Sequence, residues 1–334
     1  MRDEHPWPRL VDGAGRGVEY LRMSVTDRCD MKCAYCMPTG GAERAEGCDM
    51  LKFSEFLTLA EIFARMGVRK IRLTGGEPLV RKGILGFVRA LGRVPGVEQI
   101  ALTTNGVRLP RMAAELKEAG IDTLNISLDS LRPDRYAAIT GLDTLTQTLD
   151  GIRAALAARF ERVKVNVVVM KGVNDDEIAA FARMSLSLPV QVRFIEFMPA
   201  TPSVWSEARF MNIDAVRAAV EEIGELTPAT PQQWGGPAKV YRLPGAAGEV
   251  GFIAAVSRHF CDDCNRLRLT SSGKLMTCLF GKEDLDLAAS LRGGADPRTI
   301  ADSITAALAV KNAVRTLPGD PHDRTRPSMT CIGG

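Results

Sequence analysis

The chain reads DRCDMKCAYCMP from residue 27 to residue 38, so Cys29, Cys33 and Cys36 follow one another at spacings of four and three residues. With 8 cysteines among 334 residues, a chance match to this spacing has a probability on the order of 0.005. Thiolates are soft ligands that suit iron–sulfur clusters, and three of them leave one iron of a four-iron cluster open. The stretch therefore predicts a cluster whose open iron can bind another ligand. The alternative is a zinc site completed by a distant fourth ligand.

Tyr35 stands directly before the last of these cysteines, and the pattern Cys-x3-Cys-x-Tyr-Cys resembles the signature of the radical S-adenosylmethionine superfamily. The resemblance implies a 4Fe-4S cluster on the three cysteines and a contact between Tyr35 and S-adenosylmethionine. It also implies that the cofactor's amino and carboxylate groups chelate the open iron. Reductive cleavage of the sulfonium would then give a 5′-deoxyadenosyl radical that abstracts hydrogen from a second substrate.

The composition is that of an ordinary globular protein, with 46% hydrophobic residues and a net charge of +3. This length suffices for one large domain and a smaller module. The sequence has neither a long block of like charge nor a run of about 18 apolar residues, so we expect no nucleic-acid partner and no membrane partner. The N-terminus lacks the apolar run of a signal peptide, which predicts a cytoplasmic protein whose thiols hold metal. Cys48 and Cys331 stand outside any cluster spacing and are expected to be small apolar side chains.

Short β-rich runs alternate with helical patterns in the first two thirds of the chain. The helical patterns, for example 53–66, 109–119 and 145–160, repeat apolar residues at intervals of three and four. Such alternation indicates parallel β/α units, and six units fall short of the eight that close a full barrel. The predicted fold is therefore α/β, a partial (β/α)6 TIM-type barrel. Its strands are expected at 20–26, 70–74, 99–104, 123–128, 163–170 and 190–197.

A different rhythm begins after residues 227–237, a segment with three prolines and two glycines that predicts a boundary loop. The following runs are short and close together, and Ser271-Ser272-Gly273 is typical of a hairpin turn, so we expect antiparallel strands. The predicted domains are a barrel over 1–226 and a smaller C-terminal antiparallel β plus α module over 227–334. The expected strands are 238–243, 249–255, 266–270 and 274–278, the expected helices 285–292 and 296–311, and the tail from 317 should lack regular structure.

Gly75-Gly76-Glu77-Pro78 follows the second predicted strand directly. Two glycines at a strand end allow the backbone to approach a ligand closely, although a tight turn would explain the same residues. By the superfamily resemblance, Gly76 holds the methionyl amino group of S-adenosylmethionine. The resemblance implies further contacts to this cofactor at Ser127 and Met198.

A second set of cysteines, Cys261, Cys264 and Cys278, spans the predicted hairpin. A zinc knuckle completed by His259 is one interpretation, and a second cluster with an open iron is the other. Arg266 and Arg268 alternate with apolar residues and so share one face of a strand. Two guanidinium groups beside a metal site suit a polyphosphate, whereas the plainer alternative is a solvated strand face.

The two three-cysteine sets, the run Asn-Arg-x-Arg-x-Thr from residue 265 and the terminal Gly333-Gly334 together resemble the GTP 3′,8-cyclase family of molybdenum cofactor biosynthesis. The resemblance covers nearly the whole chain. It implies a lyase that joins C3′ of the GTP ribose to C8 of guanine and yields 3′,8-cyclo-7,8-dihydro-GTP. It also implies a second 4Fe-4S cluster on Cys261, Cys264 and Cys278, and a catalytic role for the diglycine tail. The implied GTP contacts are Arg22, Arg72, Thr103, Lys164, Arg266 and Arg268.

Three positions depart from the family's usual pattern, namely Asp30, Met276 and Cys331, and none of them removes a cluster ligand. The family further implies an external electron donor and a downstream cyclic pyranopterin monophosphate synthase, and a homodimer stays open. Two other interpretations compete. One is a radical S-adenosylmethionine peptide or cofactor maturase with an auxiliary cluster, which would not need Arg266 and Arg268 in a phosphate-binding array. The other is a non-catalytic iron or zinc binding protein, which would not need the glycine-rich loop.

Overall fold

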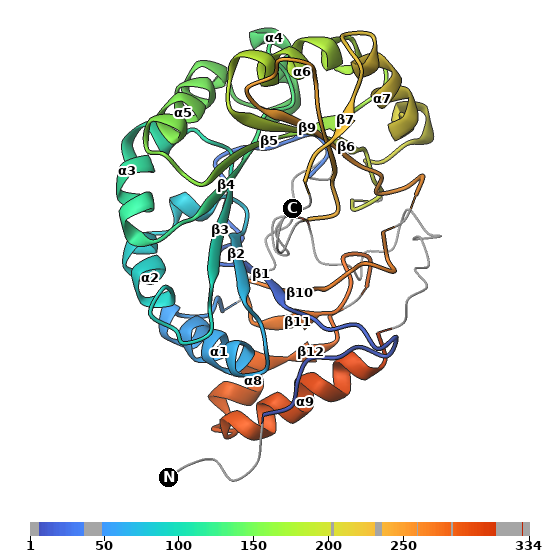
Figure 1. The fold of residues 1–334 in the computed structure, drawn as a ribbon. Helices are drawn as coiled ribbons and strands as arrows, with labels where there is room; N and C mark the ends of the chain where they lie inside the picture. Colours follow the sequence, from blue (N-terminus) through green and yellow to red (C-terminus); the bar gives the residue numbers. More distant parts are fainter. Residues whose placement is uncertain are drawn as a thin grey trace.

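Six parallel strands form the wall of an open barrel, and helices surround it on the outside (Figure 1). The computed structural model describes residues 7–36, 49–201, 204–230, 236–258, 260–281, 283–311 and residue 329. The barrel strands are β1 (Tyr20–Ser24), β2 (Lys70–Thr74), β3 (Gln99–Thr104), β4 (Thr123–Ser127), β5 (Arg162–Val169) and β6 (Val190–Glu196), adjacent in chain order. The partial (β/α)6 barrel expected from the sequence is thus confirmed.

Alternation along the strands separates the core from the barrel interior. On β1, Leu21 and Met23 are fully buried in the hydrophobic core, whereas Arg22 between them lines an interior cavity. The outer layer consists of α1 (Phe53–Arg65), α2 (Ile84–Leu91), α3 (Leu109–Ala119), α4 (Pro133–Thr140), α5 (Leu145–Ala157), α6 (Ile178–Ser187) and α7 (Ile213–Glu221). Short 3-10 turns lie at Pro78–Val80, Asp175–Glu177 and Glu207–Arg209.

The C-terminal strands extend the same sheet at both of its edges. Beside β6 lie β9 (Glu249–Ile253), β8 (Lys239–Arg242) and β7 (Thr227–Pro228), and beside β1 lie β10 (Arg266–Leu269), β11 (Lys274–Met276) and β12 (Leu285–Asp286). Pairing within each group is antiparallel, as expected, but β9 and β10 run parallel to their barrel neighbours. The chain therefore passes from one edge of the barrel to the other between Ile253 and Arg266, and this passage carries Cys261 and Cys264.

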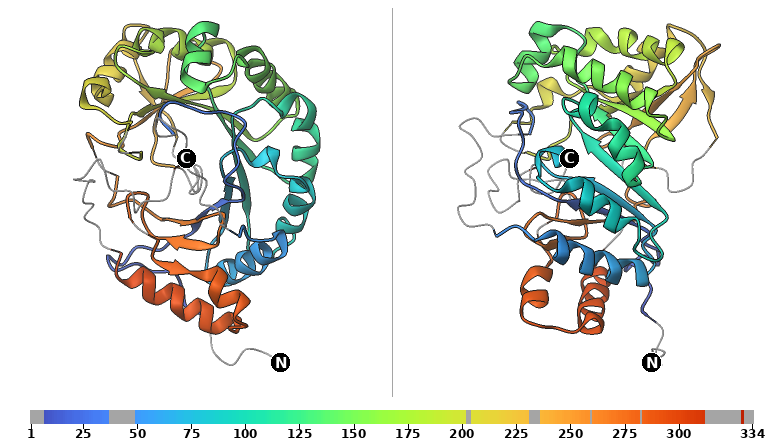
Figure 2. Two further views of the ribbon diagram at one scale, coloured as in Figure 1. Left: turned by 180° about the vertical axis from the view of Figure 1, so that it is seen from behind. Right: turned by 90° about the vertical axis from the view of Figure 1, so that its left-hand side faces the viewer.

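Two helices, α8 (Leu287–Arg292) and α9 (Pro297–Ala309), cover the β10–β12 side of the molecule (Figure 2). The sequence predicted a helix from residue 285, but Asp286 pairs with Lys274 in β12, so the helix begins two residues later. Within the described residues, no helix combines the length and apolar character needed to cross a bilayer. His259, Cys48, Cys331 and the Gly333-Gly334 tail lie outside the described residues.

Candidate active site

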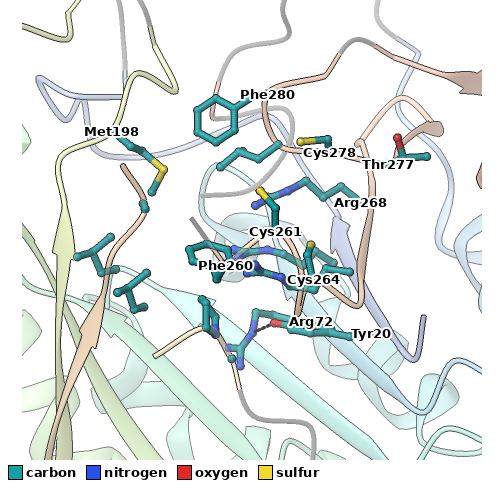
Figure 3. Close-up of a pocket in the computed structure, with 18 of the residues that line it drawn as sticks. Tyr20, Arg72, Met198, Phe260, Cys261, Cys264, Arg268, Thr277, Cys278 and Phe280 are labelled. Atoms are coloured by element: carbon teal, nitrogen blue, oxygen red, sulfur yellow. Dashed lines mark hydrogen bonds between the residues drawn. The ribbon is translucent and has the colours of Figure 1, made fainter. Parts of the chain in front are cut away.

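Two cavities adjoin inside the barrel. One, of about 190 Å³, is lined by the first cysteine set, and the other, of about 450 Å³, by the second. Asn166, Ile195 and Met198 line both cavities, as does Met329. Figure 3 shows the larger cavity, with Met198 facing the cysteines across it. A molecule bound in one cavity would thus meet a molecule bound in the other.

The thiols of Cys29, Cys33 and Cys36 line the smaller cavity, and all three are free and half-buried. The Met31 amide donates to Cys29 Sγ at 3.4 Å, a bond that favours a thiolate at this position. Among the described residues, no three Cys, His, Asp or Glu side chains are placed to hold a single metal ion. A 4Fe-4S cluster needs only one thiolate on each of three irons, and the residues fit it.

The loop after β2 leaves no room for a side chain at Gly76, because a Cβ there would lie 2.3 Å from the carbonyl oxygen of Arg28. The neighbouring Glu77 is fully buried and accepts from Thr104 Oγ1 at 2.9 Å and from the Asn105 amide at 2.7 Å. Burial raises the pKa of Glu77 to about 7 despite these bonds. Glu77 therefore ties the loop to the end of β3, and sequence reasoning gave it no such role.

Tyr35 is anchored to the opposite wall of the smaller cavity. Its hydroxyl donates to Asp129 Oδ2 at 2.7 Å, and Asp129 Oδ1 accepts from the Val168 amide at 2.8 Å. This carboxylate connects the cysteine loop to the ends of β4 and β5. Ser127 and Met198, the two other residues predicted to contact the cofactor, line the same cavity.

Strand register aligns cations around the larger cavity. Arg22 on β1 pairs with Arg72 on β2 and with Arg268 on β10, so these three residues form one row across the sheet. Arg266 lies two residues before Arg268 on β10, opposite Tyr20 of β1, and Lys164 projects from β5. All five predicted basic residues line this cavity. Thr103 instead lines the smaller cavity and accepts from Arg72 Nη1 at 3.4 Å.

Four further cations in the larger cavity escaped sequence reasoning: Arg16, Lys70, Arg193 and Lys311. Lys70 and Arg193 could have been found from the sequence, because each lies on the inward face of a predicted strand. Burial of Lys70 and Arg193 is costly unless an anion joins them. The cavity is therefore built for a ligand with several negative charges.

The pKa values of groups lining the larger cavity reflect this excess of cations. Burial and the neighbouring guanidinium groups of Arg193 and Arg72 lower the pKa of Lys164 to about 5. Burial alone would raise the pKa of Tyr20, but Arg72 and two further cations outweigh it and lower the pKa to about 7. The Tyr20 hydroxyl oxygen accepts from Arg72 Nε at 2.6 Å (dashed in Figure 3).

We expect binding of a nucleoside triphosphate at pH 7.5 to take up protons, because the added negative charge raises the pKa of both Lys164 and Tyr20. The proton uptake should fall by about one in Lys164→Met. Calorimetry in buffers of different ionisation enthalpy measures this difference, and protonation of the nucleotide itself cancels between the two proteins. Equal uptake by wild type and Lys164→Met would show that Lys164 gains no proton when the nucleotide binds.

The second cysteine set lies on one side of the larger cavity, beside Phe260 and Phe280 (Figure 3). The Cys264 amide donates to the carbonyl oxygen of Cys261 at 3.1 Å, which closes a turn between these two cysteines. Cys278, at the end of the hairpin after β11, completes the set. Three half-buried thiols from two segments, with no fourth cysteine among the described residues lining the cavity, fit a second cluster with an open iron.

Two asparagine side chains on the cavity wall have buried oxygens without a hydrogen-bond partner. They are Oδ1 of Asn125 on β4 and Oδ1 of Asn166 on β5. Since buried polar atoms are normally satisfied, these atoms indicate a polar ligand inside the barrel.

The structure describes the contacts of two residues that depart from the family pattern, Asp30 and Met276. Asp30 accepts from Asn105 Nδ2 at 2.7 Å and lies 3.5 Å from Arg108 Nε, so its charge is partly compensated. Met276 is fully buried and stands opposite Arg268 in the β10–β11 pair. Neither residue displaces a predicted ligand.

Fold and site together define a radical S-adenosylmethionine enzyme. The family model of the Radical SAM superfamily matches residues 23–185, and that of Molybdenum Cofactor Synthesis C matches residues 190–316. The chain is 48% identical to the GTP 3′,8-cyclase of Heliobacterium modesticaldum over 334 residues, covering 97% of this chain and 100% of that protein. The corresponding protein of Geobacter sulfurreducens is 44% identical, with 97% and 99% covered. The chain belongs to the GTP 3′,8-cyclase family.

Solved structures agree on the fold. Streptococcus suis SuiB bound to its precursor peptide SuiA has a TM-score of 0.62 and 13% identity, covering 82% of this chain and 64% of that chain. SuiB bound to S-adenosylmethionine gives 0.58, also at 13% identity, with 78% and 60% covered. At this identity the similarity concerns the fold alone.

Proposed function

We propose that this protein is a GTP 3′,8-cyclase that converts GTP to 3′,8-cyclo-7,8-dihydroguanosine 5′-triphosphate. The observation that carries the proposal is the junction of two cavities in one barrel, one with the S-adenosylmethionine motifs and one with a cation-rich wall. Family membership supports the same reaction. S-adenosylmethionine bound at a 4Fe-4S cluster supplies a 5′-deoxyadenosyl radical, which this reaction uses to remove the 3′ hydrogen of the ribose.

The chain's own residues bind and orient the two molecules. Cys29, Cys33 and Cys36 hold the first cluster, and Gly76 lets the loop backbone reach the methionyl amino group. Tyr35, Ser127 and Met198 complete the S-adenosylmethionine site. The ribose would lie where the two cavities join, so that its 3′ position faces the adenosyl carbon.

The triphosphate requires several cations, because it carries up to about four negative charges and loses water on binding. We assign this role to the basic wall of the larger cavity, namely Arg22, Arg72, Lys164, Arg266 and Arg268. Thr103 orients Arg72 through its hydroxyl. Cys261, Cys264 and Cys278 hold the second cluster, whose open iron would bind a nitrogen or oxygen of guanine.

The deciding experiment is anaerobic incubation of the reconstituted protein with GTP, S-adenosylmethionine and a reductant. Chromatography with mass analysis should find 5′-deoxyadenosine and a cyclised nucleotide of the same mass as GTP, because the hydrogen atom lost from C3′ is balanced by the electron and proton gained after cyclisation. A maturase would yield 5′-deoxyadenosine only with a peptide or another cofactor precursor. A non-catalytic metal carrier would yield no 5′-deoxyadenosine at all.

The remaining assignments concern the surroundings of the reaction. We assign the protein to the cytoplasm, with an external electron donor and with cyclic pyranopterin monophosphate synthase as the enzyme that takes its product. A homodimer is compatible with these assignments. The division into 1–226 and 227–334 stays a proposal, and separate expression of residues 1–226 with retention of four irons would support it.

Deletion of Gly333 and Gly334 should lower formation of the cyclised nucleotide several-fold while iron content and thermal stability stay at wild-type values. Two residues without side chains can enter a narrow site where any Cβ would clash. Turnover is to be measured at saturating GTP, beside a variant that extends the tail by one alanine. Wild-type turnover after the deletion would assign the diglycine no catalytic role.

A further inference from the structure

Lys311 follows α9, and its ammonium group reaches the passage that carries Cys261 and Cys264. The residue is only 7% exposed. Lys311 Nζ donates to the carbonyl oxygen of Arg266 at 3.0 Å and to that of Cys264 at 3.5 Å. It also lies 3.9 Å from Cys264 Sγ, within the range of a hydrogen bond to sulfur. A buried ammonium is therefore directed at a predicted cluster ligand.

Arg16 holds the other end of the same turn. Its Nη1 donates to the carbonyl oxygen of Cys261, which also accepts from the Cys264 amide at 3.1 Å. The guanidinium group pairs with Asp12 at 2.6 Å, and Asp12 Oδ1 accepts from the amides of Ala14 and Arg16 at 3.0 Å each. Because Asp12 fixes both the backbone and the side chain, Arg16 is held rigidly against the cysteine turn.

The segments that carry Arg16 and Lys311 are in close backbone contact. Arg16 lies in an N-terminal turn closed by the bridge between Val11 and Gly17. A Cβ at Gly13 in this turn would lie 2.3 Å from the carbonyl oxygen of Ala309 and 3.2 Å from that of Lys311. The N-terminal turn therefore fits directly against the end of α9, although the two segments are nearly 300 residues apart.

We propose that Lys311 and Arg16 form a cationic clamp that raises the reduction potential of the cluster held by Cys261, Cys264 and Cys278. The inference rests on the second cluster assigned above. Positive charge and N–H donation to a ligating thiolate stabilise the more negative, reduced state of a cluster. Burial strengthens this effect because little water screens the charge. Lys311 acts through Cys264, so it is a positioning residue and not a catalytic one.

The test is a redox titration of the reconstituted full-length protein followed by electron paramagnetic resonance. Addition of S-adenosylmethionine identifies the signal of the first cluster, and addition of GTP that of the second. Lys311→Met removes the charge at similar length, Lys311→Arg keeps it, and Lys82→Met is the matched control at an exposed lysine.

At the wild-type midpoint of the second cluster, Lys311→Met should lower its ratio of reduced to oxidised form about tenfold, or about 59 mV for one electron. Lys311→Arg, Lys82→Met and the first cluster should keep their wild-type values. If Lys311→Met does not retain the second cluster, Lys311→Gln replaces it in the titration. Its second-cluster midpoint should then fall by the same amount.

An unshifted second-cluster midpoint in the Met variant, or in the Gln variant where that replaces it, overturns the inference while the two-cluster proposal stands. A wild-type protein that holds only about four irons overturns both. Iron analysis of the wild type therefore separates the two failures.

Discussion

Replacing Cys33 by alanine is expected to remove about half of the bound iron and to abolish cleavage of S-adenosylmethionine. Cys33 lines the smaller cavity with Cys29 and Cys36, and its carbonyl oxygen accepts from the Cys36 amide at 3.0 Å. With one thiolate removed, only two protein ligands remain for four irons. The second set of cysteines lies in the other cavity and should keep its cluster. Iron content and release of 5′-deoxyadenosine are the two measurements.

Cys264→Ala is the matched control for this experiment, since it removes one ligand from the other set. It should also lose about half of the iron, yet retain S-adenosylmethionine binding at the first cluster. An unchanged iron content in Cys33→Ala would contradict the assignment of the first cluster. Loss of all iron in either variant would show that the two clusters do not assemble independently.

The sequence predicted the barrel and the cluster loops because both depend on local patterns. Strand β1 shows why: alternation alone places Arg22 on the opposite face from Leu21 and Met23, and the structure has this arrangement. The hairpin turn at Ser271-Ser272-Gly273 could likewise be predicted from adjacent residues alone. Gly273 adopts a φ of +85°, and the Thr270 amide donates to the carbonyl oxygen of Lys274 at 2.9 Å.

Features that depend on contacts between distant segments could not be predicted in this way. The parallel pairing of β9 and β10 with barrel strands follows from closure of the sheet, which no short pattern encodes. The same holds for Glu77, whose carboxylate partners lie on β3 and beyond. Lys311 resembles any helix-terminal lysine in the sequence. In the structure its Nζ lies 3.9 Å from Cys264 Sγ, a contact between segments that no local pattern encodes.

The basic residues predicted to contact GTP all line the larger cavity. Arg22, Arg72 and Arg268 come from segments nearly 250 residues apart and still form one row through strand register. The sequence pattern placed Arg268 on one face of a strand, whereas the roles of Arg22 and Arg72 came from the family resemblance. The parallel pairing of β10 with β1 brings Arg268 next to Arg22, and this pairing was not predicted.

Arg268→Ala should weaken GTP binding by about 1.5 to 3 kcal/mol, roughly 10- to 150-fold, without lowering the thermal stability of the nucleotide-free protein. Burial, together with Arg22 and Arg266, lowers the pKa of Arg268 well below its usual value, so the protein without bound nucleotide holds this charge at a cost. Alanine removes that cost along with the phosphate contact. Affinity and melting temperature are measured on the same reconstituted sample, with the exposed Arg111→Ala as the control. Equal binding of guanosine and GTP by the wild type would refute the phosphate role, and a large fall in melting temperature would make Arg268 a structural residue instead.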